Sequence, residues 1–160
     1  MDVESFNIER VALTVSGLHI LLAWGILNCL SLLLLFRLHQ NKSWVHFFQM
    51  CAAWGFINGL IALYGQYDVR SEISLTEAGA IWEAQKQIES LLLFNSGLDL
   101  IYVLIGILLI KRAFKAANPD RLMGFGRAII LQGSFLFVFD LGFWWAQHQH
   151  AIPFEQLMLS

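Results

Sequence analysis

Two aspartates, Asp99 and Asp140, lie within long apolar stretches, 90–110 and 128–146, that contain no lysine or arginine. If these stretches cross a membrane, a carboxylate near the bilayer centre costs about 2.5–3.5 kcal/mol on insertion scales. Such residues face the interior of a helix bundle, where they hold a proton, bind a cation or form hydrogen bonds with neighbouring amides. The two aspartates are therefore the first candidates for chemistry.

Amide and aromatic side chains recur at helical spacing in the apolar stretches. Asn95, Asp99 and Tyr102 are separated by four and three residues, which places them on one face of a helix. A tryptophan also precedes an asparagine by four residues in each of the first two apolar stretches. We expect the helices to meet along one polar seam, formed by Asp99, Asp140, Asn28, Asn58, Asn95, Gln132, Tyr102, Trp24 and Trp54.

The elements that must position this seam are four membrane spans. The chain is 58% hydrophobic and only 14% charged, against about 25% charged residues in an ordinary soluble domain. Four stretches approach or exceed the roughly 20 helical residues that cross a bilayer core of about 30 Å: 11–36, 47–65, 90–110 and 128–146. A soluble helix would show a polar face, whereas 11–36 has no Asp, Glu, Lys or Arg. The predicted fold is an all-α, four-helix transmembrane bundle, in one integral membrane domain over residues 1–160.

Basic residues flank these spans unequally. Seven lie in the connections that follow the first and third spans: Arg37, Lys42, Lys111, Arg112, Lys115, Arg121 and Arg127. The other side holds Arg10, Arg70 and Lys86. The excess of positive charge predicts that these two connections face the cytoplasm and that the N-terminus and the C-terminus lie outside. The larger basic cluster has two interpretations, as a topology determinant or as a contact for anionic lipids.

The connection 66–89 contains a helix-start signal. The run Ser74-Leu75-Thr76-Glu77 has the spacing of a capping box, in which a Ser hydroxyl and a Glu carboxylate satisfy free backbone N–H groups. We therefore expect the third helix to begin near Leu75 and to extend beyond the membrane. The part of the helix beyond the membrane has two interpretations, as a solvated helix end or as a surface for a docking partner.

An internal repeat links the first two spans. The pattern AWGxxNxL occurs at 23–30 and again at 53–60, and the second copy contains the GxxxG motif formed by Gly55 and Gly59. Such a motif favours close helix contact, either within the bundle or in a homo-oligomer. Because four spans make a thin bundle, we also expect a homo-oligomer or membership of a larger membrane complex, in contact with membrane lipids.

Other function classes lack support. Cys29 and Cys51 lie in apolar stretches without a CxxC spacing, so a disulfide scaffold and a structural metal site are not expected. No HExxH or GxSxG motif is present, so we expect neither an enzyme nor a bound cofactor. The net charge of -2 gives no basic field for a nucleic acid.

Three functions remain open from the residues alone. The first is a small channel or transporter for protons, cations or a small polar solute, centred on Asp99 and Asp140. The second is a non-catalytic accessory or scaffold subunit of a membrane complex, which docks through the face of Gly55 and Gly59 or through the outer helix 75–90. Without transport, neutral aspartates would only donate hydrogen bonds that stabilise the bundle. The third is a lipid- or quinone-binding protein that uses Trp24, Trp54 and Tyr102.

The residues of the seam also carry a resemblance. It involves Trp24, Asn28, Trp54, Asn58, the run 95–102 (NSGLDLIY), and the segments 124–126 (GFG) and 132–136 (QGSFL) before Asp140. Together these residues, within about 10–145, resemble an uncharacterised bacterial family of four-helix integral membrane proteins of unknown function. The resemblance implies a location in the bacterial inner membrane and supplies no activity.

Overall fold

The computed structural model describes residues 2–35 and 41–159, and the described residues contain helices but no strands. Helix α1 (Val3–Leu30) continues into the 3-10 turn η1 (Ser31–Leu34). Helix α3 (Lys42–Ser71) leads into the 3-10 turn η2 (Glu72–Ser74), and α4 (Ala78–Ala113) and α5 (Pro119–Leu159) complete the chain. The predicted all-α, four-helix fold is confirmed. The end of the first expected span at Phe36, and Arg37 after it, lie outside the described residues.

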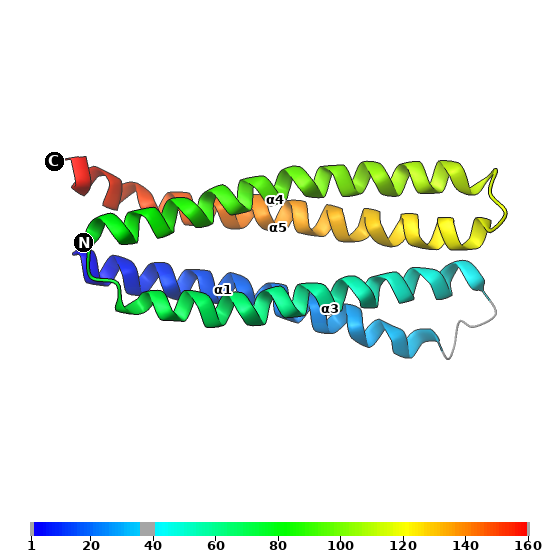
Figure 1. Ribbon diagram of the computed structural model, residues 1–160, viewed down its shortest axis with the longest axis horizontal. Helices are drawn as coiled ribbons and strands as arrows, with labels where there is room; N and C mark the ends of the chain where they lie inside the picture. The colour runs from blue at the N-terminus through cyan, green and yellow to red at the C-terminus, as the bar shows by residue number, and fades with distance from the viewer. Residues whose placement is uncertain (1, 36–40, 160) are drawn as a thin grey trace.

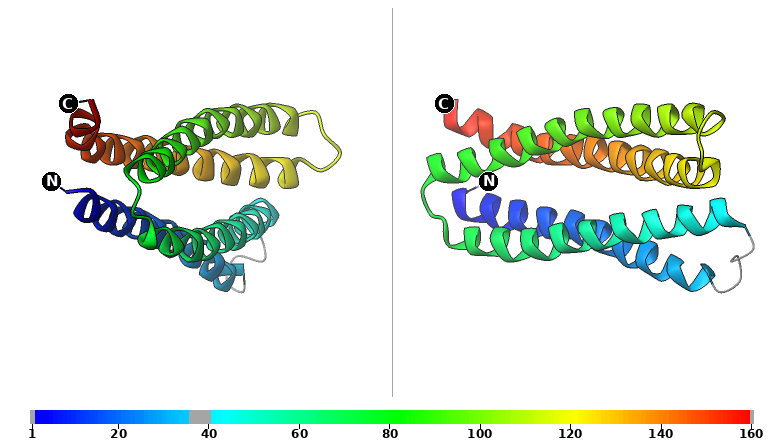
Figure 2. Two further views of the ribbon diagram at one scale, coloured as in Figure 1. Left: turned by 60° about the vertical axis from the view of Figure 1, so that its left-hand side comes forward. Right: turned by 45° about the vertical axis from the view of Figure 1, so that its right-hand side comes forward.

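The four helices form two antiparallel hairpins that lie side by side (Figures 1 and 2). Helices α1 and α3 make the first hairpin, α4 and α5 make the second, and the hairpins meet mainly where α3 packs against α5. Both termini and the α3–α4 connection lie at one end of the bundle, here called the terminal end. The α4–α5 connection lies at the opposite end, here called the loop end.

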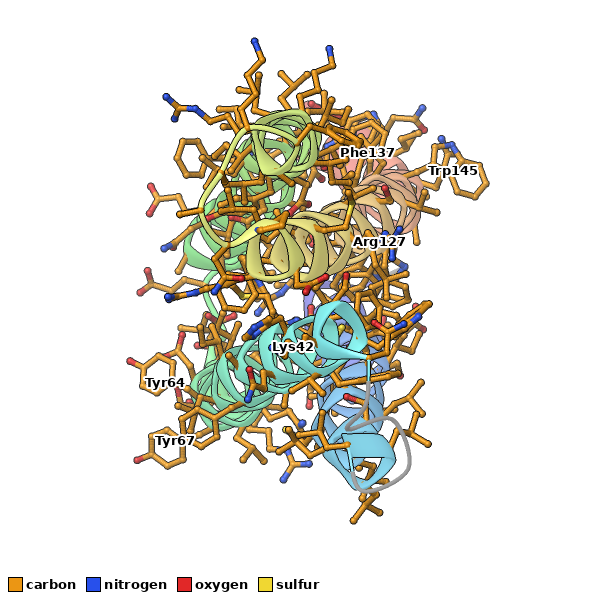
Figure 3. All side chains as sticks on the ribbon, turned by 90° about the vertical axis from the view of Figure 1, so that its right-hand side faces the viewer. Lys42, Tyr64, Tyr67, Arg127, Phe137 and Trp145 are labelled. Atoms are coloured by element: carbon orange, nitrogen blue, oxygen red, sulfur yellow. The ribbon has the colours of Figure 1, made fainter. Side chains whose placement is uncertain are left out.

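The lengths and surface of the helices indicate a membrane protein. All four are long and apolar enough to cross a membrane. At about 1.5 Å per residue, the 36 residues of α4 extend about 54 Å, so the helix is longer than a hydrocarbon core. Large apolar side chains such as Leu27, Phe56 and Val138 are more than half exposed, and Tyr64, Tyr67 and Trp145 also point away from the bundle (Figure 3). The exterior is therefore apolar while several polar side chains are buried inside.

Glycines bring the two helices of each hairpin into backbone contact. A Cβ atom added to Gly55 would lie 2.6 Å from the carbonyl oxygen of Gly25, and one added to Gly25 would lie 2.8 Å from that of Gly55. In the second hairpin, Gly106 and Gly126 approach each other in the same way. Gly25 and Gly55 occupy equivalent positions of the AWGxxNxL repeat, so the repeat places matching glycines where α1 crosses α3.

The predicted helix start near Leu75 is wrong by three residues. Helix α4 begins at Ala78, and its N-cap Glu77 makes no side-chain capping hydrogen bond. The Ser74 hydroxyl instead donates to the carbonyl oxygen of Ser71 and closes the preceding 3-10 turn, while Leu75 is extended with a ψ of 130°. The Ser74 hydroxyl therefore bonds to a residue that precedes it in the chain, so no capping box forms.

Candidate functional site in the seam between the hairpins

Three of the predicted seam residues form a hydrogen-bonded layer between the hairpins, here called the amide layer. The indole N–H of Trp24 donates to the Oε1 atom of Gln132 over 2.8 Å. The Nε2 atom of Gln132 donates to Oδ1 of Asn28 over 2.6 Å, and the Asn28 amide donates back to the backbone of Trp24. Because Gln132 is fully buried on α5 and both partners are on α1, this layer ties the first hairpin to the second.

Aromatic rings fill the space beside the amide layer. The Trp24 ring stacks on Phe135 at a centroid distance of 3.8 Å, and Phe135 stacks in turn on Phe139. On the neighbouring helices, the Trp54 ring meets the edge of Tyr102 at 5.1 Å. The tryptophans of the two repeats thus contact the second hairpin through different aromatic partners.

The other six predicted seam residues line one cavity of about 140 Å³, here called the seam cavity. Its walls come from α1, α3, α4 and α5. The lining residues are Leu21, Trp54, Asn58, Ile61, Asn95, Leu98, Asp99, Tyr102, Leu136 and Asp140. The single polar core expected from the sequence is therefore divided into two neighbouring groups, the amide layer and the seam cavity, and Leu21 and Leu136 of an apolar cluster also line the cavity.

The carboxyl groups of Asp99 and Asp140 approach closely enough to interact with each other. The two residues are only 3% and 7% exposed. Among the described residues, no lysine, arginine or histidine forms an ion pair with either of them. The Oδ2 atom of Asp99 and the Nδ2 atom of Asn58 are both buried without a hydrogen-bond partner. The cavity thus contains a free acceptor and a free donor, which is the arrangement of a site that holds a polar guest.

A second buried polar group lies at the terminal end and was missed by the sequence reasoning. Arg10, interpreted from the sequence as a flanking residue, is 0% exposed and forms an ion pair of 2.8 Å with Glu72, whose side chain is 27% exposed. Asn7 accepts from the Arg10 guanidinium over 2.9 Å and donates to three backbone carbonyl oxygens in and just after η2. These contacts fasten the N-terminal turns of α1 to the end of the first hairpin.

The same polar group continues from α1 and η2 to α4 and α5. The amide of Gln147 on α5 donates to the Thr14 hydroxyl on α1 over 2.9 Å. Gln85 on α4 donates to the backbone of Gln147 and to the carboxylate of Glu89. Lys86 and His148 flank Glu89 at 3.5 and 3.4 Å. The terminal polar cluster is defined here as Asn7, Arg10, Thr14, Glu72, Gln85, Lys86, Glu89, Gln147 and His148.

A signal for this cluster was present in the spacing. The stripe that carries Trp24 and Asn28 extends toward the N-terminus in steps of three and four through Thr14, Arg10 and Asn7. Extending the stripe beyond the apolar stretch would have predicted that Arg10 faces the interior of the bundle. Because basic residues commonly flank a span, Arg10 was interpreted from its charge, and the helix face on which it lies was not considered.

The GxxxG motif is used within the chain at one of its two positions. Gly55 is buried against Gly25 and the backbone of Cys29, as described above. Nothing lies within 4 Å of a Cβ atom added to Gly59. Gly59 therefore tolerates a side chain in this structure, whereas Gly55 does not.

Four apolar helices around a buried polar seam are the architecture of a polytopic helical membrane protein. The chain belongs to the family of unknown function DUF6992, whose family model matches residues 20–141. The match includes every predicted seam residue and agrees with the resemblance to an uncharacterised family. No curated protein and no solved structure matches the chain.

Proposed function

We propose that the protein is a membrane carrier in which the seam cavity binds a proton or a small cation between the two hairpins. The observation that carries this proposal is the pairing of two buried aspartates, Asp99 and Asp140, in the seam cavity, with no basic partner among the described residues. Two adjoining carboxylates repel each other when both are ionised, and either a shared proton or a bound cation relieves that repulsion.

The walls of the cavity support a cation as the alternative guest to a proton. The rings of Trp54 and Tyr102 line the cavity, and aromatic rings attract ammonium-type and other cations that lie over a ring face in a desolvated site. The free Asn58 amide and the free Asp99 oxygen can bind a water that accompanies the ion. Exchange of one proton for one monovalent cation would leave the charge of the carboxyl pair unchanged.

The polar contacts around the cavity favour a carrier over an open channel. The amide layer lies beside the cavity and joins α1 to α5, and the terminal polar cluster joins α1, α4 and α5 at the terminal end. A solute can pass only when the contacts between the hairpins rearrange. Glycines hold the two helices of each hairpin in backbone contact, and Gly124 holds α5 against the Ser43 backbone of α3 at the loop end. A tilt of one hairpin against the other about this loop-end contact is therefore the motion that would open the seam.

Transport measurements on purified protein in proteoliposomes test this proposal. A pH-sensitive dye inside the vesicles reports proton movement when sodium, potassium or methylammonium is added outside. The parent protein should move protons, and Asp99→Asn and Asp140→Asn should each abolish the signal. Asp120→Asn, which changes an exposed carboxylate at the loop end, is the matched control and should leave the flux unchanged.

Two results would contradict the carrier proposal. One is a parent protein with no proton or cation flux under any of these gradients. The other is a flux that both aspartate variants retain. Native mass spectrometry on the same preparation reports co-purified subunits, a homo-oligomer or a retained lipid or quinone, which are the alternatives of an accessory subunit and a lipid-binding protein.

The location that we propose is the bacterial inner membrane, with both termini outside. The excess of basic residues at the loop end supports this orientation. Gln149→Cys at the terminal end and Asn118→Cys at the loop end change exposed residues. A membrane-impermeant maleimide added to whole cells should label the first variant and not the second, and the reverse pattern would overturn the orientation.

A further inference from the structure

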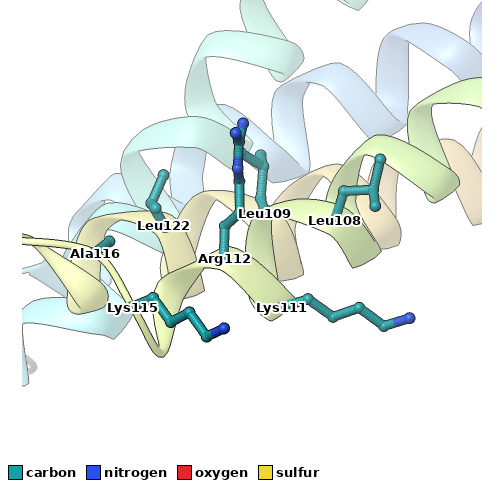
Figure 4. A pocket seen from close by; sticks show the side chains of 7 residues that line it. All are labelled: Leu108, Leu109, Lys111, Arg112, Lys115, Ala116 and Leu122. Atoms are coloured by element: carbon teal, nitrogen blue, oxygen red, sulfur yellow. The ribbon is translucent and has the colours of Figure 1, made fainter.

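An open pocket of about 720 Å³ lies at the loop end, outside the seam (Figure 4). It is lined by three cationic and four apolar residues, and none of the lining residues is acidic. The lining residues are Leu108, Leu109, Lys111, Arg112, Lys115, Ala116 and Leu122. The pocket thus combines an apolar side with a positively charged side.

The three cations have no protein counter-charge. No ion pair among the described residues involves Lys111, Arg112 or Lys115. The other described basic residues of this end include Arg121 and Arg127, which instead lie over the rings of Phe125 and Trp44. Lys111 and Lys115 extend in the same direction along α4, whereas Arg112 reaches the other side of the pocket beside Leu109 (Figure 4). The positive charge therefore frames the pocket and has no ion-pair partner within 2–35 and 41–159.

The pocket lies at the depth where the membrane changes from hydrocarbon to headgroups. Between Glu89 and Lys111, the only charged residue of α4 is Asp99, and the 90–110 stretch is about 30 Å long as a helix. That length equals the hydrocarbon thickness of a typical bilayer. Leu108 and Leu109 end this stretch and Lys111 begins the polar region, so the apolar side faces acyl chains and the cations lie at the level of the phosphates.

We propose that this pocket binds the headgroup of an anionic phospholipid, with the phosphate held by Lys111, Arg112 and Lys115 and the acyl chains lying along Leu108 and Leu109. Cations near the C-terminus of α4 also complement the helix dipole, and that role alone needs neither a pocket nor an apolar side. Charge complementarity and depth together identify a lipid as the occupant.

Native mass spectrometry of the purified protein with added phosphatidylglycerol tests the proposal. The parent protein should retain phosphatidylglycerol through detergent removal and should not retain phosphatidylcholine. The triple variant Lys111→Gln, Arg112→Gln, Lys115→Gln should bind phosphatidylglycerol more weakly by a factor on the order of a hundred. The single variant Lys115→Gln, at an exposed position, should show a smaller loss in the same direction.

The matched control removes the same charge from the same end outside the pocket. The triple variant Lys42→Gln, Arg121→Gln, Arg127→Gln should keep the parent affinity. Equal losses in the two triple variants would mean diffuse electrostatic attraction and would overturn the proposal. Retention of inorganic phosphate by a parent protein that retains no phosphatidylglycerol would also overturn it, because a free anion would then be the guest. Far-UV circular dichroism verifies that each variant is folded.

Discussion

The contacts within each hairpin differ in kind from most of the contacts between the hairpins. Within a hairpin, glycines bring backbones together along the middle of the helices, as at Gly25 and Gly55 or at Gly106 and Gly126. Between the hairpins, Gly124 lies against the Ser43 backbone at the loop end. Elsewhere in the seam, hydrogen-bonded amides, stacked rings and a cavity occupy the space, as with the bond between Trp24 and Gln132. Backbone contact leaves no room for a guest, whereas long side chains can change rotamer and partner.

This difference indicates which parts of the molecule act as units. Each hairpin has a close internal interface, and the first is also held by the ion pair of Arg10 with Glu72 at its end. The seam combines a satisfied amide layer with a cavity whose Asp99 and Asn58 have unpartnered atoms. If the hairpins are the rigid units, substitutions within them will reduce stability, and substitutions in the cavity will affect binding and transport.

The largest loss of stability is expected for Arg10→Met. Removing one partner of a buried ion pair leaves the other uncompensated, and the cost is about 3 kcal/mol, at the lower end because the Glu72 side chain is 27% exposed. Unfolding of the detergent-solubilised protein, followed by far-UV circular dichroism, measures it. Arg70→Met, at an exposed arginine of the same end, is the control and should change stability little. Equal stability of the two variants would show that the ion pair between Arg10 and Glu72 does not stabilise the first hairpin.

The two glycines of the GxxxG motif should respond in opposite directions. Gly55→Ala places a methyl group 2.6 Å from the Gly25 carbonyl oxygen, and such overpacking costs about 2 kcal/mol. Gly59→Ala meets nothing within 4 Å and gains up to about 1 kcal/mol of helix propensity. The same unfolding assay compares them. A loss at Gly59 as large as that at Gly55 would mean that a second copy of the chain packs on this face.

A smaller loss is expected from Gln132→Leu, which keeps the approximate volume and removes the link between the hairpins. The variant loses the hydrogen bonds to Trp24 and Asn28, and at about 0.6 kcal/mol each the total is about 1 kcal/mol. Gln149→Leu, on the exposed side of the same helix, serves as the control. Stability unchanged from the parent would show that the amide layer does not hold the hairpins together.

The smallest effect on stability is expected from Asp140→Asn. The amide has the same shape as the carboxyl group, and the aspartate has no ion pair to lose among the described residues, so the loss of stability should be smaller than that of Gln132→Leu. The same variant should lose transport. A variant that unfolds as readily as Arg10→Met would show that the carboxyl pair is structural and would weaken the case for a carrier.

Hydropathy and helical spacing predicted the four helices and the composition of the seam. Asn95, Asp99 and Tyr102 share one cavity because residues spaced by four and three lie on one face of any α-helix. That prediction needs only the local geometry of each helix. The start of α4 was predicted less well, because Ser74 could bond in either direction along the chain and the preceding turn recruited it.

The sequence by itself determined that the chain forms long apolar helices with polar stripes, because length, hydropathy and helical period are properties of each segment alone. The tertiary structure decided which stripes meet. It paired Gln132 with Trp24 and Asn28, buried Gly55 but not Gly59, and turned Arg10 toward Glu72. These outcomes depend on where two helices cross and how far one is displaced along the other, and that is set by the packing of all four helices together.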